Sequence, residues 1–354
     1  MPELNVVKYI TTTPILKTLF GNEPLHVKEI GDGNLNFIFR AQTAQKSLIL
    51  KYSPPYLRML GKAFKLPQSR ICAEMHTMAY FKSIASEFIP TLYHCDEKAF
   101  LFVMEDLEGY ETLQQKQLHE PISMSIYAKL GDFLALMRTH TPPLMPESYY
   151  ENNTLKTISE NYIFRYPYIL NHEALVVPSF LAQSPHSKLF EANIATLTEL
   201  FLHAKETLVH GDLHTGSIMI KEENLKIIDA EFAFFGPIGF DIGTLFAHIL
   251  FGEIYAKFAH KPHQSELALS TLWEHFMAHN SNDNILLQTS IGFCGAELLR
   301  RLFVPAKAKA LETLSVAKKK EAYQLTHSLA VELVESSLHV KHFDIFLAIV
   351  KKYL

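Results

Sequence analysis

Three acidic residues, Asp212, Asp229 and Glu231, have a spacing that can bring them into one site. The chain between the two aspartates predicts two short apolar strands, 217–220 and 225–228, joined by a polar turn. Folding this hairpin about its turn returns the later aspartate to the neighbourhood of the earlier one. We therefore expect the three carboxylates to lie close together, although 17 positions separate the two aspartates.

This arrangement suits a metal ion and a proton acceptor. In an extended segment, residues i and i+2 point to the same side, so Asp229 and Glu231 should direct two carboxylates at one point. Such like charges repel each other unless a cation neutralises them, and Mg²⁺ favours a few carboxylates together with nucleotide phosphates. Asp212 would then be available to receive a proton from a substrate hydroxyl. For any one of these acids alone, a turn or a helix cap is the simpler explanation.

A glycine-containing loop and a lysine on the next strand suggest a phosphate site. The loop contains Gly31, Gly33, Asn34 and Asn36, and glycines there allow backbone N–H groups to approach phosphates. Lys51 ends an apolar strand shortly afterwards, where its ammonium group could pair with phosphates. A plain β-turn and a lysine that extends to solvent are the alternatives.

The elements that must position these residues fall into two regions, which predict an α+β fold. The first region, residues 1–105, is mainly antiparallel β structure with one helix. Its predicted strands are 26–30, 35–41, 46–52, 91–95 and 99–104, and its helix is 69–86. The second region, residues 106–354, is mostly helical. Its predicted helices are 122–140, 188–205, 265–279, 290–303, 308–336 and 338–353. A small β region followed by a larger helical one predicts a ligand cleft between them, with 105–107 as a hinge.

Composition excludes several classes of protein. The net charge of −4 gives no basic footprint for nucleic acid. Cys72, Cys95 and Cys294 are too few and too scattered for a disulfide framework or a zinc site, which favours a cytoplasmic location. No segment resembles a signal peptide, and apolar runs such as 343–350 are far too short for a membrane span.

One predicted helix carries acid and base at helical spacing. Glu297 and Arg301 are separated by four positions, so a surface ion pair is the ordinary explanation for them.

The stretch around Asp212 resembles the catalytic loop of protein-kinase-like phosphotransferases, such as aminoglycoside and choline kinases. Those families carry an asparagine five residues after the aspartate, where this chain has Ser217, and an Asp-Phe-Gly-like element, where this chain has Asp229-Ala230-Glu231. Both departures are similar to the 5-methylthioribose kinase family. The resemblance covers about residues 25–305, is strongest over 208–243 and becomes faint beyond 305.

The resemblance implies roles for individual residues. Asp212 would be the catalytic base, Asp229 and Glu231 the metal ligands, and Asp241 a brace for the loop. Lys51 would pair with the α- and β-phosphates of ATP, with Glu74 as its less secure helix partner.

Two further segments are similar to the family. In the hinge, Glu105 and Leu107 would read the adenine edge through backbone groups, and Met104 would flank the ring unless it is simply core. In the family's Glu-Leu-Ile-Arg-Arg element, the matching Arg300 and Arg301 would face the transferring phosphate and the sugar. The family also implies a protein-kinase-like two-lobed fold, ATP and Mg²⁺ as cofactors, a role in methionine salvage and a homodimer.

Two other functions stay open at this point. One is another small-molecule kinase of the same superfamily, acting on choline, homoserine or an aminoglycoside, although the paired arginines argue against cationic acceptors. The other is a non-catalytic binding module, which would usually have lost Lys51, Asp212 or Asp229. A protein kinase is disfavoured, because no Ala-Pro-Glu-like element follows Glu231.

Overall fold

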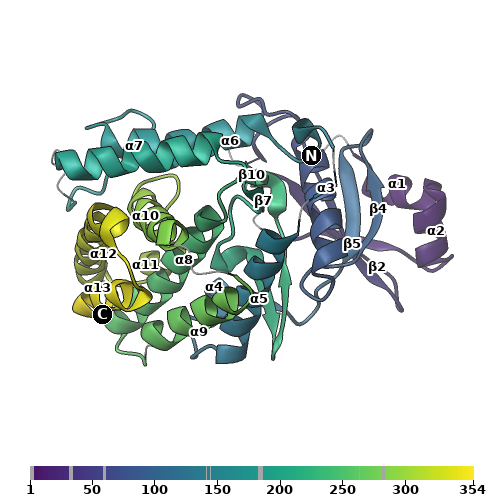
Figure 1. The fold of residues 1–354 in the computed structure, drawn as a ribbon. Coiled ribbons are helices and arrows are strands. Elements are labelled where there is room, and N and C mark those ends of the chain that lie inside the picture. The colour runs from purple at the N-terminus through teal and green to yellow at the C-terminus, as the bar shows by residue number, and fades with distance from the viewer. Residues whose placement is uncertain are drawn as a thin grey trace.

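The computed structural model describes residues 4–31, 35–58, 61–140, 142–143, 145–181, 186–262, 264–280 and 284–354. It shows an antiparallel sheet near the N-terminus followed by a mainly helical region (Figure 1). The fold class predicted from the sequence is therefore confirmed.

The N-terminal sheet has five antiparallel strands in the order β1-β2-β3-β5-β4. Its strands are β1 (His26–Glu29), β2 (Phe37–Gln42), β3 (Ser47–Tyr52), β4 (Leu92–Asp96) and β5 (Leu101–Glu105). Two helices that the sequence did not predict, α1 (Val6–Thr12) and α2 (Pro14–Phe20), precede them. These two helices cover one face of the sheet, and α3 (Arg70–Ile84) covers the other.

Alternation along β3 decides which residues face α3. Leu48 and Leu50 pack on the α1–α2 side, while Ile49 packs against apolar residues of α3. Lys51 lies two positions after Ile49, so the two-residue period of a strand turns its side chain toward α3 as well.

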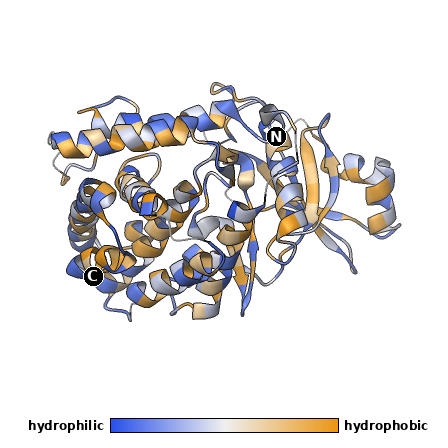
Figure 2. Cartoon of the chain, viewed as in Figure 1, coloured by the Kyte–Doolittle hydropathy of each residue, from blue (hydrophilic) through white to orange (hydrophobic). Residues whose placement is uncertain are grey.

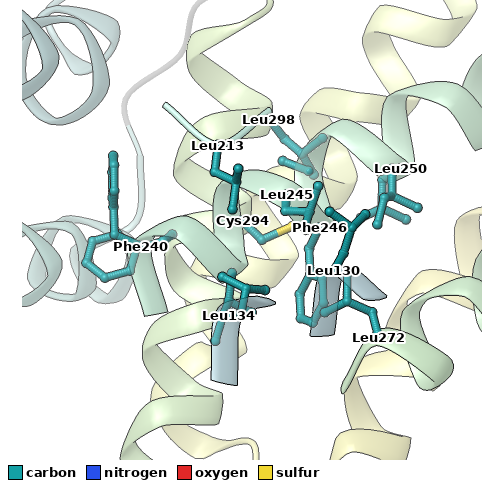
Figure 3. Packing of buried hydrophobic residues seen from close by; sticks show 14 of the residues in the cluster. Leu130, Leu134, Leu213, Phe240, Leu245, Phe246, Leu250, Leu272, Cys294 and Leu298 are labelled. Carbon is teal, nitrogen blue, oxygen red and sulfur yellow. The ribbon is translucent and has the colours of Figure 1, made fainter. Parts of the chain in front are cut away.

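The helical region is built around α8 (Ile238–Ala259), which is buried along most of its length. Figure 3 shows residues of α8, including Leu245, Phe246 and Leu250, packed against side chains of α5, α9 and α10. A Cβ at Gly243 would lie 2.5 Å from the Ser290 carbonyl oxygen, so this glycine permits the close approach of α8 and α10. The helices near it are α4 (Leu113–Lys116), α5 (Met124–Thr139), α6 (Asn153–Glu160), α7 (Lys188–His203), α9 (Ser265–Ala278), α10 (Asn284–Arg300), α11 (Lys309–Glu312), α12 (Val316–Ser336) and α13 (Phe343–Tyr353).

The helix α8 corrects two expectations. It was not among the predicted helices, and it is apolar and long enough to cross a membrane, unlike the runs considered from the sequence. However, 94% of its most apolar window is buried inside the protein, as expected for a core helix. In Figure 2 it lies among other helices, and apolar residues predominate along it. The single helix predicted for 308–336 is in fact two helices, α11 and α12.

The predicted hairpin between the two aspartates is present. It consists of β8 (Ile218–Lys221) and β9 (Asn224–Ile227), and β6 (Glu111–Thr112) pairs with β8. A second small sheet joins β7 (Thr207–Val209) to β10 (Phe234–Gly236). These short strands enclose the loop that carries Asp212, and they hold the start and the end of the acidic stretch together.

Candidate active site

Lys51 links the N-terminal sheet to α3 and to the acidic segment that follows β9. Its Nζ donates to Glu74 Oε1 and to Asp229 Oδ1, each at 2.7 Å. Burial would lower the pKa of Lys51, but the charges of Asp229 and Glu74 raise it above its ordinary value. Burial raises the pKa of Glu74, against the influence of the lysine. The expected contact between Glu74 and Lys51 is thus confirmed.

A second buried link holds Glu231. Asn36 donates from Nδ2 to Glu231 Oε2 at 2.8 Å, and Arg70 donates from Nη2 to Asn36 Oδ1 at 2.9 Å. Arg70 is 1% exposed and also donates to the Pro54 and Leu35 carbonyl oxygens. From the start of α3, Arg70 therefore holds Leu35 and Asn36 and, through Asn36, the acidic element. The sequence did not identify this role of Arg70, because all its partners but one are distant in the chain.

The backbone around Asp212 is held by a buried brace. Asp241, at the start of α8, accepts hydrogen bonds from the N–H groups of His210 at 2.6 Å and Gly211 at 3.0 Å. Burial raises the pKa of Asp241 to about 7, although both hydrogen bonds oppose this shift. Gly211 has φ = +81°, and a Cβ there would lie 2.0 Å from the Phe232 carbonyl oxygen. Glycine is required at this turn for both reasons.

The Asp212 carboxylate is surrounded by nitrogen atoms. Arg301 Nη2 donates to Asp212 Oδ1 at 3.2 Å, and Arg300 Nη2 lies 3.6 Å from the same oxygen. His214 Nε2 lies 3.5 Å from Asp212 Oδ2. Burial would raise the pKa of Asp212, but His214 and the two arginines hold it below its ordinary value. The carboxylate is therefore ionised at neutral pH and suited to accept a hydrogen bond from a hydroxyl group.

The two arginines share a buried carboxylate, which corrects the surface ion pair expected for this helix. Glu297 is only 2% exposed. It accepts from Arg301 Nε at 2.6 Å, and Arg300 Nε lies 2.8 Å from its other oxygen. The Nε2 atom of His248, on α8, lies 3.1 Å from Glu297 Oε1. Because a buried charge needs such partners, this cluster is part of the site and not a solvated helix face.

The acidic element differs in backbone shape from the extended segment that was expected. Asp229 has φ = +66°, and Ala230–Phe232 form a 3₁₀ helix. Both carboxylates nevertheless line one cavity. Burial would raise the pKa of Asp229, but Lys51 holds it below its ordinary value, whereas burial raises that of Glu231.

These two carboxylates fit a Mg²⁺ ion shared with a nucleotide. The Asp229 side chain is 40% exposed, so it remains accessible beside its contact with Lys51. Among the described residues, no group of three or more metal-ligating side chains is found. Two carboxylates completed by phosphate oxygens are a donor set that Mg²⁺ accepts, whereas Zn²⁺ sites usually need more protein ligands.

The structure describes the residues predicted to bind adenine but only part of the glycine loop. Gly31 has φ = +74°, which suits a glycine at a turn, whereas Gly33 and Asn34 lie outside the described residues. Met104 is 9% exposed and packs between the sheet and α3. The Glu105 N–H already donates to the Thr91 carbonyl oxygen at 2.8 Å. Leu107 is buried, and its role in adenine binding stays a prediction.

Six of the candidate residues line one cavity of about 370 Å³ between the sheet and the helical region, whereas the lining does not include Gly31, Met104, Glu105, Leu107 or Arg300. It contains Asn36, Lys51, Asp212, Asp229, Glu231 and Arg301. Residues from beyond position 305 also reach it, namely Lys307, Lys309 and Thr313. No sequence motif assigned a role to these last three residues, and only their place in the fold brings them to the cavity.

Comparison with known proteins agrees with this geometry. A model of the phosphotransferase enzyme family matches residues 26–266. A methylthioribose kinase from Exiguobacterium sibiricum is 31% identical, and the match covers 92% of this chain and 94% of that protein.

Solved structures show the same fold at low identity. A choline/ethanolamine kinase family protein from Mesorhizobium loti has a TM-score of 0.52 at 14% identity, covering 98% of each chain. Amicoumacin kinase hAmiN, solved in complex with AMP-PNP, Ca²⁺ and Ami, also has a TM-score of 0.52 at 14% identity, covering 94% of this chain and 95% of that one. The chain belongs to the phosphotransferase enzyme family, and within it to the methylthioribose kinase family.

Proposed function

We propose that the protein transfers the γ-phosphate of ATP to the anomeric hydroxyl of 5-methylthioribose, giving 5-methylthioribose 1-phosphate. The observation that carries this proposal is the convergence of Arg300 and Arg301 on Asp212, which lines one cavity together with Arg301 and Lys51. The similarity to a methylthioribose kinase over nearly the whole chain supports the choice of acceptor.

Each residue has a distinct task in this proposal. Asp212 accepts a hydrogen bond from the acceptor hydroxyl and takes its proton as the new P–O bond forms. Lys51 pairs with the α- and β-phosphates, and the two arginines face the γ-phosphate and the sugar. These groups contribute mainly by positioning the reactants and by balancing charge.

Asp229 and Glu231 would hold Mg²⁺, which supplies positive charge to the phosphate oxygens during transfer. Asn36 keeps the Glu231 carboxylate in place, and Lys51 does the same for Asp229. The adenine would lie against Met104, with the backbone of Glu105 and Leu107 at its edge.

The charges around the cavity favour a neutral acceptor over a cationic one. Four cationic residues, Lys51, Arg301, Lys307 and Lys309, line it beside three carboxylates, Asp212, Asp229 and Glu231, so the lining has no acidic excess that would attract a choline or an aminoglycoside. 5-Methylthioribose carries no charge, so it does not need such an excess. A role in methionine salvage, a cytoplasmic location and a homodimer belong to the same proposal.

The test is ADP release from ATP and Mg²⁺ with four acceptors: 5-methylthioribose, choline, homoserine and kanamycin. We expect turnover with 5-methylthioribose alone, and its loss in Asp212→Asn. Turnover with another acceptor would overturn the substrate but keep the chemistry. ATP binding without turnover on any acceptor would indicate a binding module.

A further inference from the structure

A buried carboxylate behind the arginine pair carries an inference beyond the roles assigned above. Glu297 lies on α10, one turn before Arg300 and Arg301, and both of its oxygens are occupied. Its Oε1 accepts a hydrogen bond from Arg301 Nε at 2.6 Å, and its Oε2 lies 2.8 Å from Arg300 Nε in an ion pair that lacks hydrogen-bond geometry. Its side chain is only 3% exposed, so solvent does not weaken these interactions.

The contact at Nε has a specific geometric consequence. A guanidinium group is planar, so a contact at Nε restricts the orientation of the group and with it the directions of the two Nη atoms. Here the Nη2 atoms of Arg300 and Arg301 lie 3.6 Å and 3.2 Å from Asp212 Oδ1. Glu297 therefore holds the inner end of both side chains, while their outer ends face the carboxylate proposed as base.

The cluster is also tied to the loop that carries Asp212. His248 of α8 contacts Glu297 Oε1 through Nε2 at 3.1 Å, and its ring lies 5.0 Å from that of His214 at an angle of 28°. His214 in turn faces Asp212 Oδ2 at 3.5 Å. Side chains from α8, α10 and the loop thus form a ring of contacts that includes the proposed base.

The balance of charge in the cluster also indicates that Glu297 holds the two arginines. Two adjacent guanidinium groups repel each other, and the Glu297 and Asp212 carboxylates are the anions that contact them. Replacing Glu297 with a neutral residue would leave Asp212 as their only anionic partner in this cluster of described residues. The arginines would then be expected to close on Asp212 and to withdraw it from the acceptor.

We propose that Glu297 is a positioning residue, which holds Arg300 and Arg301 by their Nε atoms so that their outer ends serve the phosphate and the acceptor. His248 supports Glu297 from α8. This inference rests on the proposed function for its kinetic consequence, but the geometry of the cluster can be tested without an acceptor.

The kinetic test compares Glu297→Gln with a matched control, Glu253→Gln. Glu253, on α8, is a buried carboxylate like Glu297 and is 8% exposed. It accepts a hydrogen bond from the Gln264 N–H and does not line the cavity. We expect Glu297→Gln to lower kcat with 5-methylthioribose by about 30-fold or more, with the Kd of ATP changed less than about twofold. Glu297→Asp, which keeps the charge, should recover part of the loss. The control should keep its kcat within about threefold.

A second readout needs no acceptor. The Nε–H proton of Arg301, which donates to Glu297 at 2.6 Å, can be followed by ¹⁵N NMR and assigned with Arg301→Lys, and it should exchange slowly with water in the wild type. It should exchange fast in Glu297→Gln and slowly in Glu253→Gln.

Unchanged exchange in Glu297→Gln would overturn the inference, as would an unchanged kcat in the folded variant or an equal loss of kcat in the control. If the wild type turns over no acceptor, the proposed function fails, and the exchange measurement alone decides whether Glu297 holds the arginines.

Discussion

His214 should make the stability of the fold depend on pH in a way that can be measured. Burial lowers its pKa to about 3, although Asp212 opposes this shift. Its Nδ1 accepts a hydrogen bond from the Gly216 N–H at 2.9 Å, which requires that nitrogen to be unprotonated. The ring packs against His248, and its side chain is 21% exposed. The imidazole is therefore neutral in the folded protein at any pH near neutrality.

The size of the effect follows from linkage. In the unfolded chain an imidazole takes up a proton below pH of about 6.5, whereas in the fold His214 does so only near pH 3. The contribution of His214 to the free energy of unfolding is therefore fully present above its pKa in the unfolded chain. It is lost as the pH falls from that value toward its lower pKa in the folded protein. Between pH 7 and pH 5, the loss from His214 is about 2 kcal/mol.

The assay is urea unfolding of the wild type and of His214→Asn at pH 7, 6 and 5. Asparagine does not titrate, and its Oδ1 can still accept the Gly216 N–H. The wild type should lose about 2 kcal/mol more than the variant between pH 7 and pH 5. We compare the wild type with the variant because Asp241 also titrates over this range. Burial raises the pKa of Asp241 to about 7, so this residue stabilises the fold as the pH falls, in the opposite direction to His214. Parallel curves for the two proteins would refute a neutral, buried His214.

Three other results are expected. Gly211→Ala should destabilise the fold by at least about 2 kcal/mol in urea unfolding, because a Cβ would meet the Phe232 carbonyl oxygen as well as a left-handed backbone. Gly61→Ala, with φ = +76° but nothing within 4 Å of the added Cβ, should cost about half as much, and equal losses would contradict the steric argument. Glu74→Gln should reduce kcat/KM for ATP by about 10- to 100-fold in steady-state assays, since Lys51 loses a charged partner, and unchanged kinetics would exclude this role. Chelation by EDTA should abolish ADP release and added Mg²⁺ should restore it, whereas full activity in EDTA would argue against a metal.

Local patterns in the sequence were sufficient to predict most strands of the N-terminal sheet. The strand predicted at 46–52 matches β3 to within one residue, because its apolar and β-branched residues lie between a turn and two prolines. The helix α8 was missed for a physical reason. It is apolar on all sides, so no 3.6-residue pattern distinguishes a buried face from an exposed one. Its length of 22 residues and its lack of prolines were the available signals.

The site was predictable where its chemistry lies in short motifs, and not where it depends on distant contacts. The positions of Asp212 and Asp229 in one cavity followed from a hairpin, since the loop between them is short. The burial of Glu297 did not follow, because helical spacing to an arginine is the same on a surface and in a core. Its contact with His248 spans 49 positions and requires the packing of α8 on α10.

The pairing of charges across the cavity bears on how nucleotide and metal bind together. Lys51 is held by Asp229, and Arg301 by Asp212, so each cation that would meet a phosphate is already matched by a carboxylate. A triphosphate that draws Lys51 away leaves Asp229 without its cation and beside added negative charge, which costs free energy even though the Asp229 side chain is 40% exposed. Asp229 would hold Mg²⁺ in this state, and the ion would offset the cost by supplying positive charge beside the carboxylate. We therefore expect ATP to bind more tightly with Mg²⁺ than alone, and Asp229→Asn to reduce that difference, as calorimetric titration with AMP-PNP can measure.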